Sequence, residues 1–309
     1  MKRKKPNELD RIIHRIDVIE KNRPSYKEIL EFFKDIVKQQ YKIKSLINVE
    51  AVDINRETVK KQMMEGFPLI DKNEIKLDMD SATTLFKKIC RTIQRKNKKI
   101  APEIKKINQA LRHNKIEVQE LFKKLLSGDK EYFDSIGKNN GSYFNKWLLI
   151  FLAQNSINPV LEAYADRIKG YVEQDSWRKG YCPVCGSEPL MGKIKNVEGV
   201  EGAKFLICSS CGFEWRFDRI LCPFCGNGDH KKLRHFYIEK EGKGYRVDVC
   251  DICKKYIKTI DLRELKIDVI PHVEDIGTIH LDIIAQNEGY KRDILNILDM
   301  EKMGSDAEV

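Results

Sequence analysis

Apolar residues recur every three or four positions through most of the chain before residue 175, a pattern that predicts amphipathic helices. The pattern is clear after Pro24, a residue suited to the first turn of a helix. Further helices are expected after a cap at 79–81 and over 104–113, 115–126, 143–154 and 159–172. Such helices with short connections are typical of a helical bundle. We therefore predict an all-α domain over residues 1–175.

The pattern changes after Trp177 to short apolar runs separated by turns. Strands are predicted over 204–207, 213–220, 235–239 and 245–249, with a hairpin turn at 242–244. Helical spacing returns over 276–286 and 290–300. The predicted fold class is a multidomain α+β protein. The helical domain is followed by two tandem rubredoxin-like or zinc-ribbon modules, at 176–220 and 221–270, and by a C-terminal helical segment at 271–309.

Eight of the nine cysteines form four C-x-x-C pairs, and two of these pairs share the pattern C-P-x-C-G. Each C-P-x-C-G pair is followed, after an apolar hairpin, by a second pair, so the unit is an internal repeat. Two such turns supply four thiolates in a tetrahedron. We predict two metal ions per chain, one at site one (Cys182, Cys185, Cys208 and Cys211) and one at site two (Cys222, Cys225, Cys250 and Cys253).

Thiolate ligands suit both zinc and iron, so the spacing leaves the metal open. A four-cysteine site has no open position for substrate, which argues against metal-dependent hydrolysis. Phosphate-binding, dinucleotide-binding and zinc-protease motifs are absent from the sequence. Cys90, on a predicted helix, is expected to be a small buried residue. We therefore expect a protein that is not an enzyme.

The formal net charge of +10 falls to about +6 once eight thiolates hold two divalent ions. That charge is too modest, and too dispersed, for a dedicated nucleic-acid binder. The sequence contains no apolar run of about 18 residues that would predict membrane insertion. The basic N-terminus leads into Asn7-Glu8-Leu9-Asp10, unlike a secretory signal. We expect a cytoplasmic location, and the oligomeric state is open.

Residues 159–292 resemble the FdhE family of formate dehydrogenase accessory proteins. The match comprises the four cysteine pairs and their flanks, including Trp177, Gly180, Pro189, Glu214, Trp215, Arg219, Gly226, Asp251, Tyr256, Lys258, Asp275, Leu281, Asp282, Gly289 and Tyr290. In the N-terminal half, Gly66, Pro68 and Leu69 are similar to a family motif. One segment departs from the family, because residues 271–274 read Pro-His-Val-Glu where Ala-Asp-Asp is more usual.

The resemblance implies a cytoplasmic maturation factor that acts on the catalytic subunit of a respiratory formate dehydrogenase before export. It also favours iron, at rubredoxin-like sites. Two other functions stay open: a rubredoxin-like electron carrier and a nucleic-acid-binding zinc-ribbon protein.

Three residues are candidates for the partner surface: Glu214, Arg219 and Asp275. Strand alternation places Glu214 on one face and Trp215 and Arg219 on the other. Trp215 is expected to be a wedge between the two modules. Glu214 and Arg219 are equally compatible with an ion pair inside the protein.

Overall fold

The computed structural model describes residues 7–50, 55–71, 76–136 and 145–294. The chain forms two compact units. Residues 1–51, 71–164 and 295–309 make up the helical unit, and residues 52–70 and 165–294 make up the sheet unit. Residues 52–70 thus lie within the first predicted domain yet group with the sheet. No described helix is long and apolar enough to cross a membrane.

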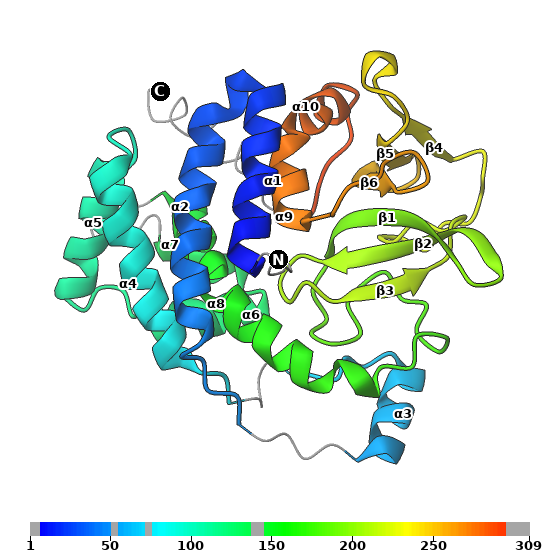
Figure 1. Cartoon of the computed structure of the whole chain (residues 1–309). Helices are drawn as coiled ribbons and strands as arrows, with labels where there is room; N and C mark the ends of the chain where they lie inside the picture. The colour runs from blue at the N-terminus through cyan, green and yellow to red at the C-terminus, as the bar shows by residue number, and fades with distance from the viewer. Residues whose placement is uncertain (1–6, 51–54, 72–75, 137–144, 295–309) are drawn as a thin grey trace, which may run out of the picture. The chain divides into compact units, whose positions relative to one another are not determined.

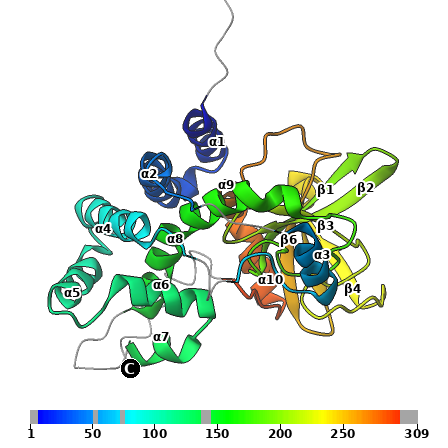
Figure 2. The ribbon, with the colours of Figure 1, turned by 90° about the horizontal axis from the view of Figure 1, so that it is seen from below.

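The helical unit contains helices where the periodicity predicts them, and two that were not predicted, α1 and α7. Its elements are α1 (Glu8–Asn22), η1 (Pro24–Tyr26), α2 (Lys27–Lys44), α4 (Met79–Lys96), α5 (Ala101–Arg112), α6 (Val118–Ser127), α7 (Lys130–Ile136) and α8 (Lys146–Ile168), whose last four residues belong to the sheet unit. Helices α1, α2, α4 and α5 follow one another in a row (Figures 1 and 2). Asp78, rather than the segment that follows it, caps α4 by accepting a hydrogen bond from the Ser81 amide.

The prediction of two helices separated near Pro159 is wrong, because α8 continues through this residue. A proline has no N–H to donate to the carbonyl four positions earlier. In this structure Gln40 Nε2 donates to that carbonyl, on Asn155, at 2.8 Å. The side chain of α2 therefore supplies the hydrogen bond that the helix loses.

The sheet unit is built on one six-stranded sheet in the order β3-β2-β1-β6-β5-β4 (Figure 1). Two antiparallel halves are joined by parallel pairing of β1 with β6, Gly192 opposite Thr259. The two predicted ribbon modules thus share a sheet, and two of its strands, β1 and β6, were not predicted. The strands are β1 (Pro189–Val197), β2 (Val200–Cys208), β3 (Glu214–Phe217), β4 (Leu233–Phe236), β5 (Tyr245–Cys250) and β6 (Lys255–Asp261).

Helices α9 (Pro271–Gly277) and α10 (Ile279–Asn287) cover one face of this sheet. Leu281 and Ala285 of α10 pack on Val247 and Tyr256. The predicted helix over 276–286 is thus two helices divided at Thr278. Residues 290–294 are not helical, and the rest of the predicted helix 290–300 lies outside the described residues. The remaining elements are α3 (Arg56–Glu65), which Figure 2 shows in front of the sheet, η3 (Lys169–Tyr171) and η4 (Glu239–Glu241).

The opposite face of the sheet curls inward. Lys204 on β2 forms a 3.0 Å ion pair with Asp248 on β5, although β1 and β6 lie between them in the sheet. In a flat sheet those strands would lie about 14 Å apart. The ion pair therefore requires the two halves of the sheet to bend towards each other on this face.

Candidate metal centres

Site one forms where two tight turns meet. In the first turn the Cys182 amide donates to Ser187 O, and the Gly186 amide donates to Cys182 O, both at 2.9 Å. Gly186 has φ +70°, a left-handed conformation that favours glycine. The second turn follows β2, where the Cys208 amide donates to Phe213 O at 2.9 Å.

These turns bring the four sulfurs of site one together. Cys182 Sγ lies 3.6 Å from Cys211 Sγ, and Cys185 Sγ lies 3.4 Å from Cys208 Sγ. The amides of Ser210 and Cys211 donate to Cys208 Sγ at 3.3 and 3.4 Å. These backbone donors hold the Cys208 sulfur in place within the second turn.

Site two repeats the first turn and varies the second. The Cys222 amide donates to Asn227 O at 2.9 Å, and Gly226 again has φ +70°. After β5 the left-handed position belongs to Lys254, with φ +55°. Its four sulfurs pair as in site one, at 3.7 Å for Cys222–Cys253 and 3.7 Å for Cys225–Cys250.

Both groups fit a tetrahedral metal ion. Within each group all four sulfurs lie within 4.8 Å of one another. A metal–sulfur distance of about 2.3 Å gives a tetrahedron with edges of about 3.8 Å. The distances of 3.4 to 3.7 Å between paired sulfurs are close to that edge. Each group can therefore hold one ion, and the donor set accepts zinc or iron.

The thiols need a cation to ionise together. Burial raises the pKa of Cys182 and Cys222 well above the ordinary value. Burial also raises the pKa of Cys253, to about 11. The pKa of Cys250 is lowered instead: burial raises it, but hydrogen bonds from the amides of Cys253 and Ile252 and from the thiols of Cys225 and Cys253 together outweigh burial. A bound metal ion would offset the cost of gathering these thiolates.

The surroundings of the two sites differ. The cysteines of site one are all buried, at most 5% exposed. The chain segment after α3 covers it: the amides of Leu69 and Ile70 donate to Pro183 O and Val184 O, both at 2.8 Å. At site two, Cys225 is exposed and Cys253 is partly exposed. Ile252, within the second turn of site two, is 59% exposed.

The backbone leading into the first turn of site one lies against the backbone of the first turn of site two. A Cβ atom on Gly180 would lie 1.6 Å from the carbonyl oxygen of Pro223. Gly180 leads into the first turn of site one, and Pro223 lies inside the first turn of site two. Only glycine permits this approach.

The predicted face alternation of β3 is found, and Glu214 does not pair with Arg219. Trp215 is fully buried, and its Nε1 donates to Lys179 O at 3.0 Å. The Glu214 carboxylate forms ion pairs with Lys193 and, at 2.6 Å, with Lys195. Arg219 lies past the end of β3 and is exposed.

Asp275 lies in a network of charges between the sheet and α9 and α10. It accepts from Arg292 at 2.6 Å and lies 2.9 Å from Lys258 Nζ, and its side chain is 12% exposed. Lys258 also donates to Asp282 at 2.5 Å, and the Tyr256 hydroxyl donates to the same carboxylate at 2.8 Å. This network was not predicted, although the resemblance to FdhE proteins includes four of its five members.

Two other residues are also placed inside the protein. Glu274 is 1% exposed, and its carboxylate accepts from the Tyr245 hydroxyl at 2.7 Å. Cys90 is fully buried in the helical unit, and burial raises its pKa to about 12. Cys90 thus agrees with its expected role as a packing residue.

Comparison with known proteins agrees with this architecture. Residues 181–219 match the family model for the FdhE central domain, and residues 220–298 match that for the FdhE C-terminal domain. An FdhE homolog from Aquifex aeolicus is 29% identical over 287 residues, which cover 93% of each chain. An FdhE homolog from Stutzerimonas stutzeri is 33% identical over 117 residues, 38% of this chain and 37% of that one.

The fold also matches a solved structure. The crystal structure of the FdhE protein from Pseudomonas aeruginosa superposes with a TM-score of 0.64 and 20% identity, covering 96% of this chain and 97% of that one. The Aquifex relative spans nearly the whole chain, and the two family models together span both metal centres. These matches therefore support the FdhE family for this chain.

Proposed function

We propose that this protein is a cytoplasmic accessory factor, without enzymatic activity, that binds the catalytic subunit of a formate dehydrogenase during its maturation. Similarity to FdhE proteins, in both cysteine groups and along nearly the whole Aquifex relative, supports this proposal. The closed four-cysteine sites are consistent with it, because they leave no metal position for a substrate.

The surface at site two is the proposed contact region in the sheet unit. Ile220 precedes its first turn and Ile252 lies within its second turn, and they are 62% and 59% exposed. Arg219, next to Ile220, is also exposed. Large apolar side chains and arginine are enriched in the cores of protein interfaces. Glu214 and Asp275, the other two candidates, already hold ion-pair partners, so we propose that they support this surface from within.

Retention of the catalytic subunit during purification tests the proposal. The tagged chain is co-expressed with the subunit, and the amount retained is measured for wild type, Ile252→Lys and Val200→Lys. Val200 is the matched control because it is exposed at the far end of β2 from the metal turns. Ile252→Lys should retain at least tenfold less subunit, since a charge replaces an apolar contact, while Val200→Lys should match wild type.

Failure of the wild-type chain to retain the subunit would refute the proposed binding. Equal loss in both variants, with two metal ions still bound, would place the contact away from site two. Subunit activity measured in a host without this protein tests the accessory role separately.

A second candidate, a rubredoxin-like electron carrier, is favoured by one observation. Cys225 exposes site two to solvent, and electron transfer needs such access to the metal. Iron at site two would give the anaerobically purified chain a visible spectrum that bleaches reversibly on reduction. A colourless chain that holds two zinc ions would exclude this candidate.

A further inference from the structure

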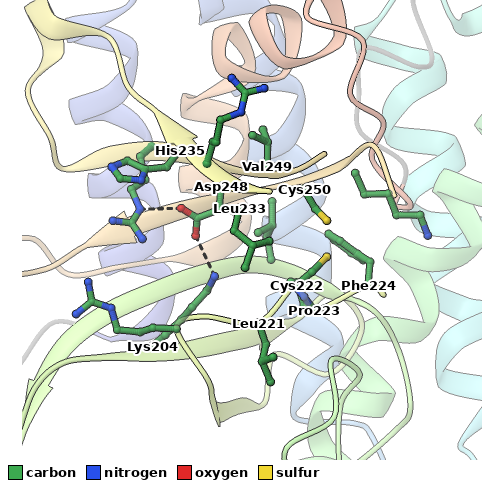
Figure 3. Close-up of a pocket in the computed structure, with 15 residues that line it drawn as sticks. Lys204, Leu221, Cys222, Pro223, Phe224, Leu233, His235, Asp248, Val249 and Cys250 are labelled. Carbon is green, nitrogen blue, oxygen red and sulfur yellow. Dashed lines mark hydrogen bonds and ion pairs between the residues drawn. The ribbon is translucent and has the colours of Figure 1, made fainter. Parts of the chain in front are cut away.

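A cavity of about 100 Å³ lies beside site two, on the curled face of the sheet (Figure 3). Figure 3 shows Cys222 and Cys250 at one side and Lys204, Asp248 and His235 at the other. Its apolar wall includes Leu221 and Leu233. The cavity therefore joins a metal centre to a group of charged side chains.

Cations outnumber carboxylates at the charged end. Lys204, Arg219 and Arg246 line it, and Asp248 is the one acidic residue in the described lining. Lys204 Nζ lies 3.0 Å and Arg246 Nε 2.8 Å from the Asp248 carboxylate. Three cations around one carboxylate leave an excess of two positive charges. The Lys204 and Arg246 side chains are only 4% and 16% exposed, so water does little to screen these two charges, whereas Arg219 is exposed.

Two of these cations have unused binding capacity. The buried Arg246 Nε has the distance of an ion pair to Asp248 but not hydrogen-bonding geometry, and it has no other hydrogen-bond partner in the described part of the chain. Arg219 takes part in none of the ion pairs between described residues. Its Nη1 would lie 2.8 Å from a Cβ on Gly202, and Nη1 of Arg263 would lie 2.9 Å from the same atom. Two guanidinium groups thus converge on a glycine.

The sulfurs of site two do not account for these cations. The described side-chain donor to a site-two sulfur is Asn227 Nδ2, 3.8 Å from Cys250 Sγ. The two remaining lysine and arginine residues of the lining hold carboxylates elsewhere, Arg234 with Asp251 and Lys255 with Asp293. Arg219 and Arg246 are therefore the donors available to a molecule in the cavity.

We propose that this cavity binds a small oxyanion, a carboxylate or a phosphate, between Arg219 and Arg246. Guanidinium groups present forked N–H donors that match the oxygens of either anion. The volume equals that of about three molecules of liquid water, which suits one such anion. The apolar walls near Leu221 and Leu233 strengthen the attraction by lowering the local dielectric.

The test is titration of the metal-loaded full chain with sodium formate, sodium acetate or inorganic phosphate, at constant ionic strength set with sodium chloride. The arginine Nε–Hε signals are followed by NMR. We expect saturable shifts, and Arg219→Gln should weaken binding about tenfold, the effect of losing one charged hydrogen bond worth about 1.4 kcal/mol. Tighter binding of acetate and formate would identify a carboxylate ligand, and tighter binding of phosphate a tetrahedral one.

Arg178→Gln is the matched control, because Arg178 is an exposed arginine of the same unit that does not line the cavity. It should bind the anions as wild type does. Shifts that fail to saturate, or equal affinities for wild type and Arg219→Gln, would overturn the proposal. The readout uses the isolated chain, so it stands whether or not the protein retains a formate dehydrogenase subunit.

Discussion

Site one and site two have the same ligands and the same first turn, yet site one is buried and site two is partly exposed to solvent. The corresponding cysteines Cys185 and Cys225 show the difference, since Cys185 is 1% exposed and Cys225 is open to solvent. The segment 66–70 covers the first turn of site one. The repeat in the sequence therefore gives two sites with the same ligands but different accessibility.

Removing one sulfur from each site should have the largest effect. Cys185→Ser should lower the metal affinity of site one, and Cys225→Ser should lower that of site two. Cys185→Ser should lose its ion and lower the free energy of unfolding by about 4 kcal/mol or more, because buried thiolates are left without a cation. Cys225→Ser should cost less, because its hydroxyl stays in water. Metal content and urea unfolding measure both effects, and equal losses would contradict the comparison.

The rate of metal loss should separate the sites next. A chelator should remove the site-two ion at least tenfold faster than the site-one ion, since the exposed side of site two admits a competing ligand. Metal release followed with a chromogenic chelator should show two phases of equal amplitude.

Alkylation of the released cysteines identifies which site loses its ion in the fast phase. After that phase, iodoacetamide should modify Cys225 first and leave Cys182 and Cys185 unmodified. Cys90 is an internal control, since its burial and its pKa of about 12 keep it unreactive while the helical unit is folded. Modification of Cys185 before Cys225 would reverse the assignment.

The smallest expected effect is the difference in stability between alanine variants of the two turn glycines. Gly186 and Gly226 both have φ +70°, so alanine should cost each about 1 kcal/mol in strain. A Cβ on Gly186 would also lie 2.9 Å from Pro68 Cγ, while a Cβ on Gly226 would meet nothing within 4 Å. Gly186→Ala should therefore cost about 1 kcal/mol more than Gly226→Ala, as measured by chemical denaturation.

A double-mutant cycle isolates that contact. Pro68→Ala removes the Cγ atom, so the combined variant Pro68→Ala, Gly186→Ala should be more stable than the sum of the single effects predicts. Additive changes in the free energy of unfolding would show that Pro68 does not clash with a Cβ atom at position 186.

Local signals in the sequence predicted the two four-cysteine groups, because a C-x-x-C turn positions its own two sulfurs. They did not predict exposure, which depends on the distant segment 66–70. The same limit applies to β6, where Lys258 interrupts the apolar alternation expected of a buried strand. Its charge is compensated by Asp282 and Asp275, from helices later in the chain. The unbroken α8 likewise depends on Gln40, over a hundred residues before Pro159.

The parallel pairing of β1 with β6 has a consequence for synthesis on the ribosome. The middle of the sheet cannot form until Thr259 has been synthesised, because Thr259 pairs with Gly192. In contrast, every ligand of site one, and the segment that covers it, precedes residue 212. Domains fold as their residues emerge, and distant pairings form late. The nascent chain can thus close site one around its ion while the last ligands of site two are still to be translated. The order of the cysteines along the chain therefore allows site one to take up an ion before site two is complete.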